Sequence, residues 1–465
     1  MTTRGSGQGR HDGRTTRARA GRRSWLSPAL GAGVGLGLLL AALSPVPATA
    51  DAAAKNRYGT PPCVAPGEVT VEEELLAEDV PRRLLAESRL GRLATAFDVS
   101  LCAFRTEKQA RWFVEKWSTL LWRAGVEDAR SVAERGQRDA DDRALYWARL
   151  SMTSAVRQWA QHHGLPAAAA ARLLATIDRV SRGQDDVRPA RGDEPVVLLT
   201  GFDPFFLPRE PRTANPSGAV ALALDGTTVQ GPDGPVRVET MLFPVRWRDF
   251  GDGMVERALE PVLTGPRVPE LVFTISQGRA GQFDLEAVNG AWRGGTVDNE
   301  AACHQGVAPV ARGLPTLRPQ PQWTRSSLPR SAMVDAGTGP FEVLDRSLVV
   351  EVPGDTPVPS TRTECPALAE DNEGTERPDG PTEGSQARAG AGGNYLSNEV
   401  AYRATLLRDA LQLDGLPVGH VHTPVLEGVD STESALSNPE FVQNRRAIIA
   451  QTTRLLEVAL AVSTD

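Results

Sequence analysis

An alternation of short apolar runs with helix-like segments fills the second half of the chain and limits how it can fold. Continuous apolar runs of this length are typical of strands buried on both faces of a parallel sheet. Helical patterns lie between several of them, at 218–224 and 398–411, and another ends the chain at about 440–462. Strands that alternate with helices predict an α/β domain with a largely parallel sheet over residues 195–462. The apolar runs are Val196–Leu199, Val236–Phe243, Leu271–Ile275, Leu348–Val352 and Val418–Val421.

A helical pattern precedes this domain. Between residues 67 and 182, apolar side chains recur at the spacing of one helix face. Such stripes form a core far more often than a ligand site, so we predict a small all-α domain of unknown role. Residues 51–66 form a lead-in and 183–194 a charged linker. The stripes are Phe113, Trp117, Leu120 and Leu121; Leu145, Ala148, Met152, Val156 and Trp159; and Leu173, Ile177 and Val180.

Residues 353–392 interrupt the alternation. This stretch is rich in Pro, Glu, Gly and Thr. A loop of this length without regular structure is uncommon in a compact domain. We therefore interpret it as an insertion into the α/β domain, held in place by Cys365.

The N-terminal residues 1–50 have the order of a signal peptide. A basic stretch ends at Arg22-Arg23, an apolar run follows from Trp25 to Leu43, and Ala48-Thr49-Ala50 is a small-x-small cleavage site. The arginine pair also fits a twin-arginine signal, and an ordinary secretory signal is the alternative. The chain is thus predicted to be secreted after cleavage behind Ala50, with no membrane association once the signal is removed.

The charge balance argues against nucleic-acid binding. The whole chain carries a formal net charge of -7 at pH 7. Because residues 1–50 contain seven Arg and a single acid, their removal leaves about -13. Nucleic-acid binders show a basic patch instead. We therefore expect no nucleic-acid partner.

The four cysteines are expected to form disulfides, since export makes an oxidising environment available. Three pairings are open, and Cys63–Cys102 with Cys303–Cys365 is preferred because each pair lies within one region. No CxxC motif or Cys/His cluster has the spacing of a zinc site. The sequence therefore predicts no metal and no other cofactor.

Polar and aromatic residues follow the predicted strands where each one ends. They include Gly201–Phe206, Ser276–Arg279 and His420–Pro424. Open α/β sheets bind ligands in the crevice beyond the carboxyl ends of their strands. The sequence thus predicts one site at that edge.

The same segments resemble pyroglutamyl peptidase I (pyrrolidone-carboxylate peptidase), a cysteine peptidase that removes N-terminal pyroglutamate. The resemblance covers about residues 195–462 and implies a three-layer α/β/α fold around a twisted sheet. It implies a small peptide with N-terminal pyroglutamate as substrate and partner. The matching segments, in order, are Leu199–Phe205 with Asn215-Pro216-Ser217; Pro244-Val245; Gly278-Arg279 with Glu286, Asn289 and Asp298-Asn299-Glu300; Gly393–Asn398 with Tyr402; and His422-Thr423-Pro424.

The family uses a Cys-His-Glu triad, and this chain departs from it at the nucleophile. His422 matches the histidine, and Ser397 stands where the family has cysteine. Glu286 is the preferred acid, with Asp284 as the alternative, because both would share one face of a strand. In the substrate pocket, Phe202, Phe205 and Gln277 stand at positions that match the family.

The serine leaves three functions open. Ser-His-acid triads catalyse hydrolysis in several unrelated folds. A hydroxyl is also less easily oxidised than an exposed reactive thiol. The first hypothesis is therefore an exported pyroglutamyl-peptidase-like hydrolase. A hydroxyl is less acidic than a thiol and must lose its proton to a base during attack. The alternatives are an inactive family member that binds blocked N-terminal peptides, or a hydrolase of another amide or ester.

Overall fold

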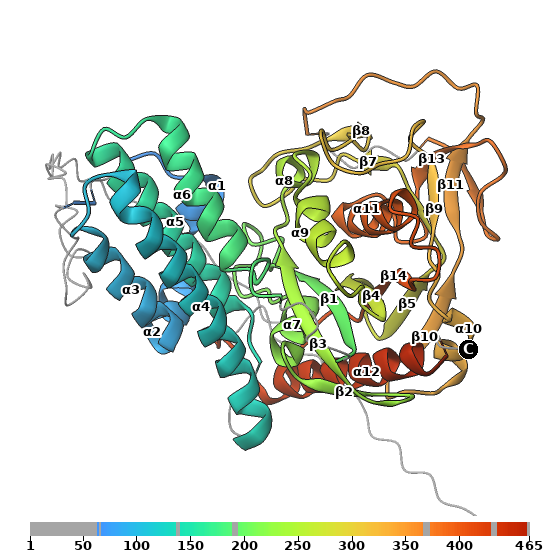
Figure 1. Cartoon of the computed structure of the whole chain (residues 1–465), viewed down its shortest axis with the longest axis horizontal. Coiled ribbons are helices and arrows are strands. Elements are labelled where there is room, and N and C mark those ends of the chain that lie inside the picture. Colours follow the sequence, from blue (N-terminus) through green and yellow to red (C-terminus); the bar gives the residue numbers. More distant parts are fainter. Residues whose placement is uncertain are drawn as a thin grey trace, which may run out of the picture. The chain divides into compact units, whose positions relative to one another are not determined.

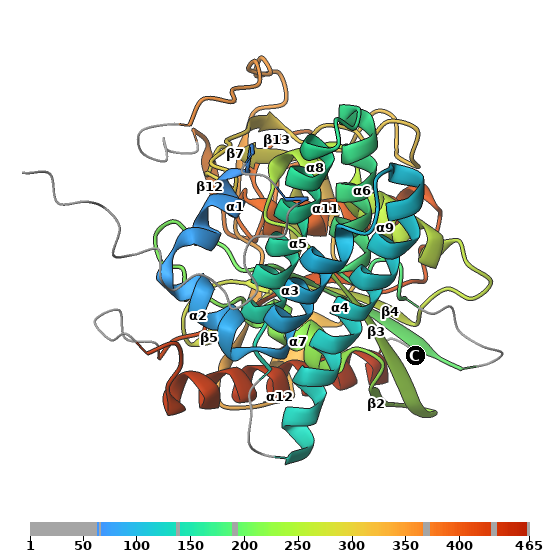
Figure 2. The ribbon, with the colours of Figure 1, turned by 90° about the vertical axis from the view of Figure 1, so that its left-hand side faces the viewer.

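The computed structural model describes residues 63–64, 67–135, 140–187, 194–365, 373–428 and 435–462. The predicted signal peptide and most of the lead-in lie outside these residues. Tyr58–Asp465 forms one compact unit. Figures 1 and 2 show the helices of residues 71–180 and the α/β elements that follow them.

The predicted helical region consists of six α-helices and a short 3-10 helix among the described residues. The first helix begins with a capping box. The Thr70 side chain accepts a hydrogen bond from the Glu73 backbone amide, and the Glu73 carboxylate accepts one from the Thr70 backbone amide. The predicted stripes face inward, with Trp159 fully buried, whereas Leu120 is 46% exposed and was wrongly assigned to the core. The elements are α1 (Val71–Glu74), η2 (Leu75–Ala77), α2 (Asp79–Glu87), α3 (Arg89–Leu101), α4 (Glu107–Arg135), α5 (Arg143–His162) and α6 (Ala167–Val180).

A seven-stranded sheet forms the centre of the α/β part, in the order β10-β5-β14-β4-β1-β3-β2. Four of its pairings are parallel, and only β2 with β3 and β5 with β14 are antiparallel. The prediction of a mostly parallel α/β sheet is confirmed. Its strands are β1 (Val196–Phe202), β2 (Thr228–Gly231), β3 (Gly234–Phe243), β4 (Leu271–Gln277), β5 (Gln282–Glu286), β10 (Glu342–Arg346) and β14 (Val418–Thr423).

Neighbouring residues of β1 belong to different hydrophobic clusters, as expected when side chains alternate across a sheet. Val197 packs in a cluster with residues of α7 (Pro216–Leu224) and α12 (Pro439–Val462). Leu198 packs in a second cluster with residues of α9 (Met254–Leu263) and α11 (Leu396–Ala410). The first cluster also contains side chains of the helical region, so helices and sheet share one core.

One prediction in the second half was wrong in detail. The run at 348–352 forms β11 (Val349–Val352), which lies in a separate antiparallel sheet with β12 (Thr375–Arg377) and β13 (Gln386–Ala389). β12 and β13 lie within the stretch 353–392 that we interpret as an insertion, so its described residues include regular structure. The remaining elements are α8 (Trp247–Gly251), α10 (Arg330–Asp335), and the pairs β6 (Val288–Gly290) with β9 (Trp323–Arg325) and β7 (Trp292–Gly294) with β8 (Gln305–Val307).

Both preferred disulfides are present, Cys63–Cys102 and Cys303–Cys365. The second connects the insertion to the α/β part, as predicted for Cys365. No helix within the described residues has the length and apolar character needed to cross a bilayer.

Candidate active site

His422 and Glu286 meet on neighbouring strands at the centre of the predicted site. In the antiparallel register of β14 with β5, Glu286 lies opposite His420, two residues before His422. Diagonal neighbours on one face of a sheet are within reach of long side chains. The Glu286 side chain spans this diagonal, and its Oε1 lies 2.6 Å from Nδ1 of His422.

The Glu286 carboxylate is fully buried. Burial opposes its ionisation, yet the neighbouring His422 and His420 rings hold the pKa of Glu286 below its usual range. Neither carboxylate oxygen makes a hydrogen bond of normal geometry among the described residues, so the approach of Oε1 to His422 Nδ1 is an ion-pair contact. A buried anion with one strong contact is suited to orienting an imidazole and stabilising its protonated form.

Asp284, the alternative acid, is bound elsewhere although it lies directly opposite His422 in the register. Its Oδ1 accepts hydrogen bonds from Gln282 Nε2 at 2.6 Å and from Arg346 Nε at 2.8 Å. Arg279 Nε lies 3.5 Å from its other oxygen. The structure therefore brings Glu286, and not Asp284, into contact with His422.

Ser397 is the second residue of α11 and is half-buried. The next residue, Asn398, anchors the start of this helix: its side chain accepts from the Gly290 amide at 2.9 Å and donates to the Gly290 carbonyl at 2.8 Å. The loop before the helix passes directly over Glu286, because a side chain at Gly392 would collide with the Glu286 carboxylate. Within the described part of the chain, the Ser397 hydroxyl makes no hydrogen bond.

The predicted pocket residues differ in accessibility. Phe202 is 3% exposed and packs in the second hydrophobic cluster, with its ring stacked 6.0 Å from that of Phe250. Phe205 and Gln277 are half-buried, and Gln277 ends β4 beside Thr423 of β14. Contact of these three residues with substrate stays a prediction.

His420 lies in a buried hydrogen-bond network with two hydroxyl groups, Thr274 and Ser276, that the sequence did not identify as its partners. Its Nδ1 lies 2.9 Å from Thr274 Oγ1 and its Nε2 lies 2.8 Å from Ser276 Oγ. Because Thr274 donates its hydroxyl to the Gly419 carbonyl, it can only accept from His420, which assigns the proton to Nδ1. Burial lowers the pKa of His420 to about 4, so the ring is neutral near pH 7. The sequence signal was the spacing of His420 and His422, two residues apart on one strand.

The same residues define the strongest candidate for metal binding among those described. Glu286, His420 and His422 each have a ligand atom within 4.8 Å of the other two. Both nitrogens of His420 are already engaged by hydroxyl groups, so a cation would have to displace one of these contacts.

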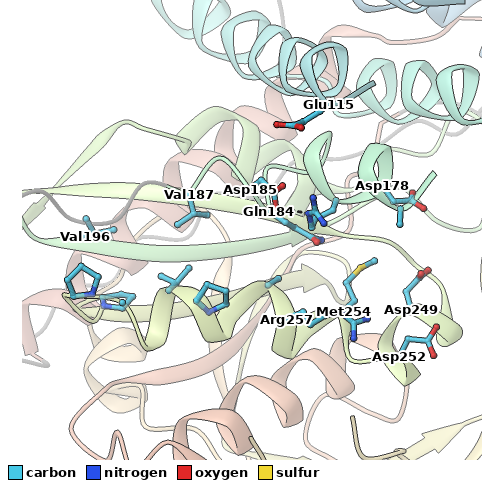
Figure 3. Close-up of a pocket in the computed structure, with 18 of the residues that line it drawn as sticks. Glu115, Asp178, Gln184, Asp185, Val187, Val196, Asp249, Asp252, Met254 and Arg257 are labelled. Carbon is cyan, nitrogen blue, oxygen red and sulfur yellow. Dashed lines mark hydrogen bonds and ion pairs between the residues drawn. The ribbon is translucent and has the colours of Figure 1, made fainter. Parts of the chain in front are cut away.

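A pocket lies away from these residues. It has a volume of about 870 Å³ and lies between the end of the helical region and α9 (Figure 3). Asp178, Asp249 and Asp252 gather at one end of it in the view of Figure 3. None of the predicted site residues lines this pocket in the described structure.

The family models of PA0049 match both parts of the chain. The PA0049 N-terminal domain matches residues 51–178, and the PA0049 C-terminal domain matches residues 196–320 and 311–427. The uncharacterized protein PA0049 of Pseudomonas aeruginosa is 32% identical over 502 aligned positions. That alignment covers 86% of this chain and 88% of the relative.

Two solved structures of pyroglutamyl peptidase I from Bacillus amyloliquefaciens are also similar, at a low level. The first is 18% identical, covers 58% of this chain and 98% of its own, and has a TM-score of 0.35. The second is 18% identical, covers 58% and 94%, and has a TM-score of 0.34. The similarity that extends along both parts of the chain is the one to the Pseudomonas protein, and it shows that this protein belongs to the PA0049 family.

Proposed function

We propose that the protein is an exported hydrolase that removes N-terminal pyroglutamate from peptides, with Ser397, His422 and Glu286 as its catalytic residues. The observation that carries the proposal is the 2.6 Å contact between His422 Nδ1 and the buried carboxylate of Glu286. An imidazole held in this way by an acid is the general base of Ser-His-acid hydrolases. The ordered motifs of the pyroglutamyl peptidase I resemblance supply the substrate class.

The proposed reaction follows from which nitrogen of His422 is engaged. Because Nδ1 faces Glu286, Nε2 accepts the proton of the Ser397 hydroxyl as Oγ attacks the pyroglutamyl carbonyl carbon. His422 then gives that proton to the departing amine. Water hydrolyses the acyl-enzyme by the same proton transfers. Backbone N–H groups at the start of α11 are suited to stabilise the oxyanion.

The remaining parts of the proposal concern the pocket, the architecture and the compartment. Phe202, Phe205 and Gln277 would hold the pyroglutamyl ring. Helices on the two faces of the sheet support the three-layer α/β/α arrangement. Two disulfides support export, with residues 1–50 as the signal peptide.

A fluorogenic pyroglutamyl amide tests the activity directly. The wild type should release the fluorophore, and Ser397→Ala should reduce the rate to the background. Ser437→Ala is a matched control, because Ser437 is an exposed serine away from the site. Ser397→Cys should be at least as active as the wild type, since a thiol is the better nucleophile. Equal rates for the wild type and Ser397→Ala would overturn the proposal.

One observation favours a second function, a non-catalytic receptor for blocked N-terminal peptides. The Ser397 hydroxyl has no hydrogen bond to His422 in the described structure. Calorimetry with a pyroglutamyl peptide separates the two functions, because a receptor would bind it without turnover. A panel of esters and amides tests hydrolysis of another acyl bond.

A further inference from the structure

The loops that follow β1 and β3 are each held by buried charges from the helical region. The β1–α7 loop begins at Asp203, which is 2% exposed. Arg149 of α5 donates from NH1 to Asp203 Oδ1 at 2.7 Å. Arg182, just beyond α6, donates from Nε to Asp203 Oδ2 at 2.9 Å. Figure 2 shows α5 and α6 within the helical region.

The β3–α8 loop is held in the same way, with the signs of charge reversed. It contains Arg246, which is 4% exposed. Glu72 of α1 lies 3.3 Å from its NH1, and Asp178 of α6 lies 3.1 Å from its NH2. Asp178 also pairs with Arg182 at 2.7 Å, so both loops are connected through one network.

Asp203 and Arg149 are ionised despite their burial, whereas burial raises the pKa of Glu72. Burial opposes the charge of Asp203, but Arg149 and Arg182 hold its pKa below the usual range. Burial lowers the pKa of Arg149 to about 10, which leaves it protonated near pH 7. A buried charge that loses one partner is left poorly compensated, so each member depends on the others for its position.

These two loops lead directly into the predicted pocket. Asp203 lies between Phe202 and Phe205, and Arg246 precedes Trp247. Asn299 connects both loops, because its side-chain amide donates to the Pro204 carbonyl and its backbone N–H donates to the Val245 carbonyl. The ring of Trp247 lies 5.2 Å from that of Tyr395. Tyr395 occupies the N-cap position of α11, the helix that contains Ser397.

We propose that the helical region positions the predicted substrate pocket. Arg149 and Arg182 hold Asp203 in place, and Asp203 in turn fixes the position of Phe205, which we place in the wall of that pocket. This inference rests on the proposed function. It assigns a role to the helical region, which the sequence alone left without one. Arg149 and Arg182 are positioning residues, because they act through Asp203.

Arg149→Met in the mature full-length protein tests the inference, with Arg157→Met as the matched control. Arg157 lies on the same helix and pairs with Glu73, within the helical region. Arg149→Met should raise KM for the pyroglutamyl amide about tenfold or more, with kcat within about threefold of the wild type. Arg157→Met should leave KM within about twofold. An unchanged KM in folded Arg149→Met would overturn the inference.

A second readout does not depend on substrate. The amides of Arg209, Glu210 and Thr213 are hydrogen-bonded within the β1–α7 loop. Their hydrogen exchange should be faster in Arg149→Met, and in Asp203→Asn if the first variant does not fold, than in Arg157→Met. Unchanged exchange would overturn the positioning role even in an active enzyme. Faster exchange in a protein without pyroglutamyl turnover would support positioning and overturn the proposed function instead.

Discussion

Glu286 and Asp284 lie two residues apart on β5, and the structure gives them different tasks. Glu286→Gln removes the charge that faces His422 while keeping the side-chain shape. We expect kcat to fall by a factor on the order of 10²–10⁴, because the imidazole loses the group that orients it and stabilises its cation. The measurement is kcat with the pyroglutamyl amide.

Asp284→Asn is the control for this prediction. Since Asp284 is bound by Gln282 and Arg346, its replacement should leave kcat within about threefold of the wild type. A larger fall in kcat for Asp284→Asn than for Glu286→Gln would assign the catalytic acid to Asp284 and contradict the account.

His420 makes stability depend on pH. Its folded pKa of about 4 lies below the value for an exposed histidine, so the unfolded chain takes up the proton first as pH falls. The contribution of neutral His420 to the free energy of unfolding is therefore fully present above about pH 6.5. As the pH falls toward 4, it decreases by about 1.4 kcal/mol per pH unit. In His420→Gln, the fall in unfolding free energy over this range should be smaller. Parallel stability curves for the two proteins, measured by denaturant unfolding, would contradict this.

The choice between the two carboxylates shows where residue-level prediction reached its limit. Sequence parity placed both on one face of a strand, and the structure confirms that they share β5. Register alone would favour Asp284, which lies opposite His422. Arg346, on the neighbouring strand β10, binds Asp284 instead, and a contact between segments so distant in sequence leaves no local signal.

At the scale of elements, the loop before α11 has a steric requirement at Gly392. A β-carbon there would overlap the Glu286 carboxylate, so Gly392→Ala should displace either the loop or the acid. We expect kcat to fall about tenfold or more, with a smaller loss of stability. Gly415→Ala is the control, because nothing lies within 4 Å of a β-carbon at that position. Equal kcat values for the two variants would contradict the steric argument.

The elements that sequence predicted best are the most uniformly apolar. β1, β4 and β14 are buried on both faces, so each is a run that stands out from its flanks. β5 did not stand out as an apolar run, because Phe283 and Leu285 alternate with three polar residues, and it was expected only from the placing of Asp284 and Glu286 on one strand face. β11 was found but assigned to the wrong sheet, since an apolar run does not specify its partner strands.

At the scale of the whole molecule, the two disulfides close loops of 39 and 62 residues. Constraint of the unfolded chain is expected to give about 4 kcal/mol for each loop. Reduction should therefore lower the midpoint of denaturant unfolding. The paired variants Cys63→Ser/Cys102→Ser and Cys303→Ser/Cys365→Ser should each give part of this loss. A midpoint that does not respond to reductant would count against a structural role for the disulfides.

The division into a helical part and an α/β part was visible in the sequence, but their connection was not. Periodicity predicts where helices form, whereas the ion network that joins Arg149 to Asp203 depends on which surfaces meet in the folded chain. Asp203 was noticed only as part of the motif after β1. Its burial between two arginines required the structure.

Acylation of the intact protein by an activated pyroglutamyl ester, stopped by acid within the first turnover so that the acyl-enzyme is trapped before water hydrolyses it, and then measured by mass spectrometry, tests the central claim most directly. The wild type should gain one pyroglutamyl group, located by digestion to the peptide that contains Ser397. His422→Ala should gain none, because no base removes the hydroxyl proton. An unmodified wild type, or a group attached to another residue such as Ser276, would contradict the assignment of Ser397 as the nucleophile.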